Sequence, residues 1–375
     1  MAIDFRSSLY LGMRHPSGEL QSWQRLTTGG PALLDEPPIN REIARQVASL
    51  QGLEHGILAP STLHLWLDFF QAIDRNTVLL IDEQAYPLMD WISRLATGRG
   101  IKVLNFPTQQ IAKLRLLLQM HVQPGQIPFI LCDGWNPISG KASPLRQYLE
   151  LLRPFRGYLV VDDTQALGIL GKNANPGCPL GLGGRGSLAW QGISSPYIVS
   201  ICSLAKGFGV PVAVMSGASA FIQPFEQKSL SRIHCSQVSA PLAAAALNAL
   251  QCNRWEGDRK RASLYGLINR FKQAVQSAGI ELKGGIFPVQ TLKLPTTELA
   301  INLFGFLQKH GFSTLLLRGE GSDQRPLISF CITIEQNPGQ YVQLGHCLQR
   351  FWANNRISSH AKPEPVYRFQ TCHWL

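Results

Sequence analysis

The chain lacks the features of membrane, disulfide-rich and metal-binding proteins. No apolar run approaches the roughly 20 residues that span a bilayer, and residues 1–10 contain no cationic stretch followed by an apolar one. The eight cysteines form no CxxC pair, and the nine histidines show no metal-ligand spacing. We therefore expect a soluble cytoplasmic protein with free thiols, no signal peptide, no membrane partner and no metal site.

Charged residues are also scarce, at 16% of the chain against 45% apolar residues, which indicates a well-buried globular protein. The net charge of +11 first suggests nucleic-acid binding. However, the basic residues are scattered, and no run is longer than Arg259-Lys260-Arg261. Attraction of an anionic substrate and a merely basic surface explain the charge equally well. Nucleic acid is therefore not an expected partner.

Short β-branched runs alternate with helical patterns from about residue 41. The predicted strands are 56–59, 77–81, 102–105, 128–132, 157–161, 197–202 and 210–215, and the predicted helices are 39–50, 63–73, 87–97, 108–120 and 145–152. This alternation predicts an α/β fold with a mostly parallel sheet that helices cover on both faces.

The pattern changes near residue 254. Helices predicted at 218–230, 240–253 and 256–278 precede three strands (287–294, 313–317 and 327–334) and two further helices (297–309 and 339–353). We expect a smaller α+β domain here. The predicted division is an N-terminal segment 1–40 that packs on the small domain, a large domain 41–253 and a small domain 254–375, with the tail 356–375 on the surface.

Two charged residues at strand ends suggest the chemistry. Lys206 lies in the small-residue turn Ser203–Gly209 after an apolar strand, and Asp162 ends another such strand. A lysine can form a Schiff base with an aldehyde cofactor, and a buried carboxylate can keep a pyridine nitrogen protonated, so the pair predicts pyridoxal 5′-phosphate (PLP). The alternatives are a surface lysine and, for one acid of the pair, a helix cap, which we assign to Asp163.

Four segments resemble the α-oxoamine synthases, most of all the 8-amino-7-oxononanoate synthases among them. They are Leu9–Pro16 (LYLGMRHP), Gly140–Leu145 (GKASPL, after Asp133-Gly134), Val161–Gly171 (VDDTQALGILG) and Ser203–Gly209 (SLAKGFG). The resemblance implies PLP fold type I with a smaller C-terminal domain. It also implies a homodimer with active sites at the subunit interface. The implied reaction condenses an amino acid with an acyl-CoA or acyl-carrier thioester, with decarboxylation.

The same resemblance assigns site residues position by position. It makes Lys206 the Schiff-base lysine and Asp162 the partner of the pyridine nitrogen. The phosphate ligands it implies are Ser203, Ser61, Thr62 and, across the subunit interface, Ser236. Tyr86 stands where the family stacks a histidine on the cofactor ring, and Asp133 and Asn136 complete the implied cofactor site. A helix N-cap at Ser61 and a core position for Tyr86 remain alternatives.

The substrate side departs from the family. Gln165 replaces a histidine that contacts cofactor and substrate, and Pro137 replaces a usual serine. The arginine that grips the substrate carboxylate has no clear counterpart, with Arg318 and Arg325 as candidates. Two alternatives thus stay open: another fold-type-I enzyme (aminotransferase or decarboxylase) acting on an atypical amine, and a non-catalytic partner subunit. The presence of Lys206 argues against the latter.

Overall fold

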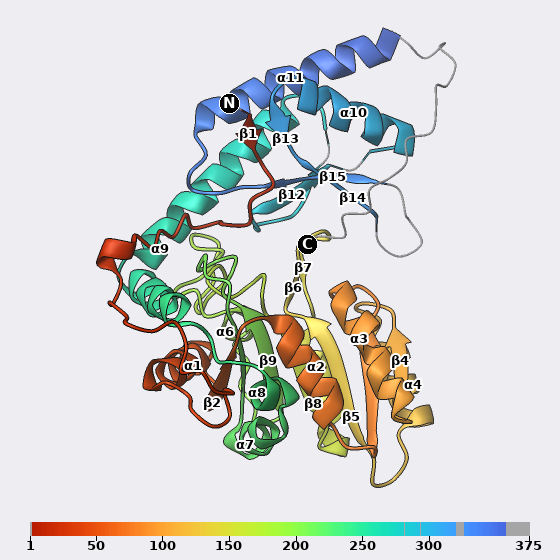
Figure 1. Cartoon of the computed structure of the whole chain (residues 1–375). Helices are drawn as coiled ribbons and strands as arrows, with labels where there is room; N and C mark the ends of the chain where they lie inside the picture. The colour runs from red at the N-terminus through yellow and green to blue at the C-terminus, as the bar shows by residue number, and fades with distance from the viewer. Residues whose placement is uncertain (1, 281, 293, 320–325, 358–375) are drawn as a thin grey trace. The chain divides into compact units, whose positions relative to one another are not determined.

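The computed structural model describes residues 2–280, 282–292, 294–319 and 326–357 (Figure 1). The contacts within the chain divide it into two compact units. One consists of Met13–Asn136 with Ala142–Arg261, and the other of Met1–Gly12, Pro137–Lys141 and Ala262–Leu375. We call them the large and the small unit. Residues 13–40 group with the large unit. The predicted surface tail falls mostly outside the described residues.

A seven-stranded sheet in the order β2-β10-β9-β8-β5-β3-β4 forms the centre of the large unit. Its strands are β2 (His55–Ala59), β3 (Thr77–Asp82), β4 (Lys102–Phe106), β5 (Ile127–Asp133), β8 (Tyr158–Asp162), β9 (Ile198–Ser203) and β10 (Ala213–Gly217). All point the same way except β10, which pairs antiparallel with both β2 and β9. This pairing confirms the predicted mostly parallel sheet. Strands such as β3, which is buried along its whole length, need cover on both faces.

Helices supply this cover from both sides of the sheet (Figure 1). They are α1 (Pro38–Gln51), α2 (Thr62–Ala72), α3 (Pro87–Gly98), α4 (Ile111–His121), α5 (Leu145–Leu152), α6 (Ser187–Trp190), α7 (Ser219–Lys228) and α8 (Leu230–His234). Helices α2 and α3 pack on the face that carries Leu79, while α4 and α5 pack on the face that carries Val78. Neighbouring residues of β3 therefore point into two separate cores, as the pleat of a strand requires.

Two short 3-10 helices (Ser17–Glu19 and Arg153–Phe155) and the two-residue strands β6 (Trp135–Asn136) and β7 (Lys141–Ala142) complete the first part of the chain. Helix α4 begins three residues later than predicted. Gln109 has a φ of 62°, in the left-handed region that a right-handed helix does not contain, so the helix begins only after it.

The small unit contains a four-stranded antiparallel sheet in the order β11-β12-β15-β14. These strands are β11 (Leu282–Lys283), β12 (Val289–Leu292), β14 (Leu315–Leu317) and β15 (Leu327–Cys331), with β1 (Ile3–Asp4) paired to β13 (Phe312–Ser313) and with helices α10 (Thr297–Lys309) and α11 (Pro338–Ile357). Phe5, Phe271 and Phe330 form its aromatic core, with ring centroids 5.2–6.0 Å apart.

The prediction of two helices at 240–253 and 256–278 is wrong. A single helix, α9 (Ala240–Gln276), runs for 37 residues through the unit boundary at Arg261. Gly257 does not break it. A Cβ at Gly257 would lie 2.6 Å from Asn253 Oδ1 and 2.9 Å from Arg261 Nη2, so the glycine makes room for this buried pair. The close packing around position 257, and not a break in the helix, explains why a glycine stands there.

The described cysteines form no disulfide, and four of them (Cys132, Cys202, Cys331 and Cys347) are buried. Within the same residues no cluster of His, Cys, Asp or Glu could hold a metal ion. Nor is any helix of the described chain both long enough and apolar enough to cross a membrane.

Candidate cofactor site

The carboxyl ends of the parallel strands bring the predicted site residues to one edge of the sheet. Ala59, which ends β2, and Ser203, which ends β9, both lie opposite Ala213 of the intervening strand. Asp133, which ends β5, lies directly opposite Asp162, which ends β8. The segments that follow these strands therefore start from the same edge, where open α/β sheets bind ligands.

The carboxyl groups of the buried Asp162 and the partly buried Asp133, together with Lys206, set the charges at this edge. Burial raises the pKa of Asp162, and hydrogen bonding to Thr164 and the charge of Lys206 partly offset this effect. Burial and the charge of Asp162 raise the pKa of Asp133 well above its ordinary range, while Lys206 lowers it. Lys206 thus interacts electrostatically with both acids. Neighbouring buried carboxylates oppose each other's ionisation, and a cation between them favours the charged form.

Backbone N–H groups fix the orientation of both acids. Thr164 N donates to Asp162 Oδ1 at 3.0 Å, and Tyr86 N donates to Asp133 Oδ1 at 3.1 Å. Burial, followed by the charges of Asp162 and Asp133, raises the pKa of the Tyr86 phenol. The half-buried Tyr86 side chain therefore lies within the field of both acids, at the start of α3.

The predicted phosphate ligands lie at the start of α2 and the end of β9. Ser61 is the N-cap residue of α2, with φ −159° and ψ 162°, and Thr62 begins the helix. Within the described residues the Ser61 side chain makes no cap hydrogen bond, and its Oγ lies 2.8 Å from His64 Nδ1. Ser203 Oγ accepts from Ala205 N at 3.1 Å. The first N–H groups of a helix have no partner inside the helix, which suits this end of α2 to an anion.

Three further candidates differ in how firmly the structure ties them to this edge. Asn136 is buried, and its Nδ2 donates to Gln84 O at 3.3 Å. Gln165 is buried in the turn after Asp162. Ser236 is exposed in the link between α8 and α9, where it pairs with Pro31, and no described contact joins it to the other candidates.

Asp163 is not the N-cap residue of a helix that directly follows it, but its carboxyl group accepts from the first N–H of a later helix, α6, and so serves that helix end. Its fully buried carboxyl group accepts from Ser187 N at 3.1–3.2 Å and from Ser187 Oγ at 2.5 Å, at the start of α6. Gln51 Nε2 donates to Asp163 Oδ2 at 3.4 Å and to Ser200 Oγ at 2.7 Å. Burial raises the pKa of Asp163 to about 7. Asp163 therefore ties β8 to α1, α6 and β9 behind the site.

Thr164 is a further residue that sequence reasoning missed. Its Oγ1 accepts from Ser203 N at 3.0 Å, while its own N–H holds Asp162. It thereby fixes the end of β8 to the start of the lysine turn. Its position directly after two acids at a strand end was the available signal.

Comparison with known proteins identifies the family. The family model "Aminotransferase class I and II" matches residues 55–312, so the chain belongs to that family. It is 26% identical to a putative 8-amino-7-oxononanoate synthase of Thermosynechococcus vestitus over 80% of this chain and 75% of that one. It is 29% identical to the 8-amino-7-oxononanoate synthase of Marinobacter nauticus, but there the match covers only 50% of this chain and 45% of the relative.

Solved structures show the same fold. An 8-amino-7-oxononanoate synthase from Francisella tularensis matches with a TM-score of 0.74 and 19% identity, over 95% of this chain and 99% of that one. A serine palmitoyltransferase from Sphingomonas wittichii matches with a TM-score of 0.81 and 14% identity, over 95% and 88% of the two chains. The fold is thus PLP fold type I. Membership of this family makes the chain a PLP-dependent transferase.

Proposed function

We propose that the chain is an acyltransferase that joins an amino acid to an acyl thioester with loss of carbon dioxide, as an 8-amino-7-oxononanoate synthase-like enzyme. The named relatives and the four sequence segments that resemble α-oxoamine synthases support this function. One observation carries it: Asp162 and Asp133 lie side by side at the carboxyl ends of β8 and β5, at the sheet edge from which the Lys206 turn also starts.

The residues at this edge fit PLP. When bound, PLP supplies an electron-withdrawing ring that stabilises negative charge next to the amino group of its substrate. Lys206 would hold the cofactor aldehyde and then carry the substrate α-proton on its ε-amino group. Asp162 would keep a proton on the pyridine nitrogen, and its burial makes this ion pair strong because water is excluded. Tyr86 would stack on the ring.

The remaining candidates would serve the phosphate and the substrate. We propose the start of α2, at Ser61 and Thr62, together with Ser203 as the phosphate site, since helix-terminal N–H groups and hydroxyls bind anions. Asp133 would hold Tyr86 in place through the Tyr86 backbone N–H. Asn136 and Gln165 would contact the cofactor or substrate in place of the family's serine and histidine.

We further propose a homodimer with active sites at the interface, to which Ser236 would contribute a phosphate ligand for the partner subunit. The resemblance to α-oxoamine synthases supports the dimer, and the exposed side chains of Leu34 (81% exposed) and Trp255 (79% exposed) in the large unit are candidates for its interface. Light scattering during size-exclusion chromatography should give twice the chain mass. A monomer that binds PLP stoichiometrically would contradict this. A cytoplasmic location stays a prediction from cysteine usage.

The carboxylate group of the amino acid substrate would also need a cationic side chain to bind it. Arg318 follows β14 in the small unit, while the other candidate, Arg325, lies outside the described residues. Without a confirmed arginine, and with Gln165 in place of histidine, an aminotransferase or decarboxylase that acts on an atypical amine is the second candidate.

Product analysis separates these functions. The holoenzyme is incubated with a panel of amino acids, with and without acyl-CoA thioesters of graded chain length, and free CoA, carbon dioxide and keto acid are measured. CoA and carbon dioxide released in equal amounts, and only when both substrates are present, support the synthase. Keto acid formed without acyl-CoA supports the aminotransferase, and carbon dioxide alone supports the decarboxylase. A protein that is colourless and free of PLP would instead be a non-catalytic partner subunit.

A further inference from the structure

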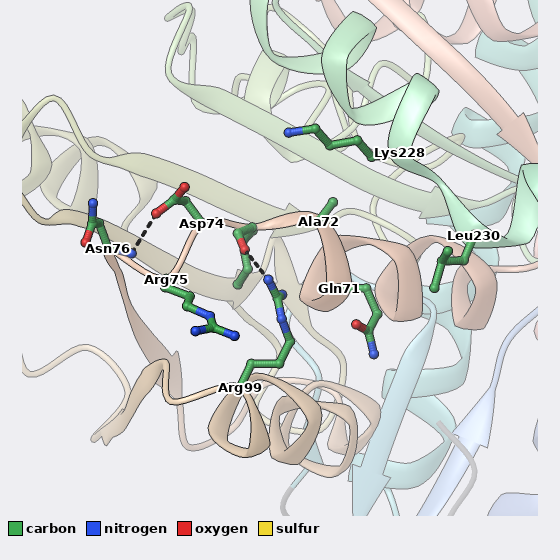
Figure 2. Close-up of a pocket in the computed structure, with 9 residues that line it drawn as sticks. Gln71, Ala72, Asp74, Arg75, Asn76, Arg99, Lys228 and Leu230 are labelled. Atoms are coloured by element: carbon green, nitrogen blue, oxygen red, sulfur yellow. Dashed lines mark hydrogen bonds between the residues drawn. The ribbon is translucent and has the colours of Figure 1, made fainter.

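A cavity lies in the large unit at the opposite edge of the sheet from the candidate cofactor site. Its volume is about 660 Å³. The residues that line it are Gln71, Ala72, Ile73, Asp74, Arg75, Asn76, Arg99, Lys228 and Leu230 (Figure 2). Residues 73–76 connect the end of α2 to the first residue of β3, so the cavity lies at the amino end of that strand. Asp162 and Lys206 lie beyond the carboxyl ends.

Three cationic side chains face this cavity from three different elements. Arg75 comes from the loop before β3, Arg99 from the C-terminal end of α3, and Lys228 from the last residue of α7 (Figure 2). Among the described residues none of the three forms an ion pair within 4.0 Å. Asp74 is the single acid among the lining residues, and its Oδ1 accepts from Asn76 N at 2.8 Å. The cavity therefore carries an excess of positive charge.

Arg99 is held in place before any ligand arrives. Its Nη1 donates to Phe70 O at 2.8 Å and its Nη2 donates to Ile73 O at 3.0 Å, at the end of α2. These bonds satisfy two carbonyl groups that a helix end leaves without partners. They use two of the five N–H donors of the guanidinium group, and three remain. A fixed guanidinium group loses little conformational entropy when it binds an anion.

We propose that this cavity is a binding site for a small polyanion with a diphosphate group, separate from the cofactor site. Guanidinium groups match the geometry of phosphate oxygens, and Lys228 adds a point charge from across the cavity. The volume far exceeds that of one phosphate group, and three cations from separate elements suit more than one phosphate. Gln71 and Asn76 add amide donors. An anion would also relieve the repulsion among the three cations.

Calorimetric titration of the PLP-loaded protein with inorganic pyrophosphate tests the proposal, because loading fills the cofactor's own phosphate site. We expect saturable one-site binding that weakens between low and physiological salt, as screening requires. The double variant Arg75→Gln/Lys228→Gln should bind about tenfold more weakly or worse, since it removes two charge-assisted contacts at the surface. Thermal unfolding should confirm that this double variant and the wild type are equally folded.

A matched control removes the same charges elsewhere. Lys113 and Arg115 are exposed on α4 and do not line the cavity. The variant Lys113→Gln/Arg115→Gln should bind pyrophosphate like the wild type. A titration with ADP in place of pyrophosphate distinguishes two kinds of ligand. Tighter binding of ADP than of pyrophosphate indicates a nucleotide ligand, and equal affinity indicates recognition of the diphosphate group alone. Absence of binding to the wild type, or equal weakening in both double variants, would overturn the proposal.

Discussion

Replacing Asp163 by asparagine should remove a large part of the pH dependence of stability. The carboxyl group of Asp163 is fully buried, and its pKa is raised from the ordinary 3.8 to about 7. The unfolded chain releases this proton near pH 4 and the folded protein releases it near pH 7. Between these values the folded state binds more protons, so the group's contribution to stability falls as pH rises.

The size of this effect follows from the difference between the two pKa values. It corresponds to about 4 kcal/mol, present in full below pH 4 and lost above pH 7. Asparagine does not titrate, yet its Oδ1 can still accept from Ser187 N. The free energy of unfolding of Asp163→Asn relative to wild type should therefore rise by about 4 kcal/mol from pH 4 to pH 8.

Urea unfolding at one-unit pH steps, followed by tryptophan fluorescence at saturating PLP, measures this difference. Asp90→Asn, at an exposed acid in the first turn of α3, serves as the control and should follow the wild-type pH curve. If the curves of Asp163→Asn and wild type stay parallel across this range, Asp163 is not a protonated group buried behind the site, and the reasoning fails.

Three further substitutions have defined outcomes. Gly186→Ala should lower stability by about 3 kcal/mol or more in thermal unfolding, because φ is +87° and a Cβ would lie 1.9 Å from Asp163 Oδ2. Arg261→Lys should cost about 3 kcal/mol in urea unfolding. The buried guanidinium group donates to Gly168 O at 2.9 Å and also bonds two side chains, which an amine cannot reproduce. Asp162→Asn should leave the fold intact but weaken PLP binding and lower kcat by roughly a hundredfold or more, as measured by cofactor titration and steady-state kinetics.

Much of the fold was predictable because the inner strands of the large sheet are buried on both faces. Their continuous apolar runs, such as Thr77–Asp82, stand out against the helical periods between them. Lys206 and Asp162 could be found for a related reason: Asp162 ends such a run, where a buried charge needs a specific partner, and Lys206 lies in the small-residue turn after another. Their shared location follows from the parallel strand order.

Contacts between residues far apart in the sequence were not predictable. Gln51 lies 112 residues before Asp163 and Ser187 lies 24 residues after it, so no local pattern announces their hydrogen bonds. The space that Gly257 leaves in α9 for Asn253 and Arg261 likewise becomes visible only in three dimensions. The polyanion cavity also combines three distant segments, each with one cation that looks like an ordinary surface residue.

The most direct test of this account asks where PLP attaches. The purified protein is reduced with borohydride in the presence of PLP and digested, and the peptides are analysed by mass spectrometry. The account predicts one pyridoxyl group per chain, on Lys206, and none on the Lys206→Ala variant. A label on a different lysine, or unchanged labelling of the variant, would contradict it.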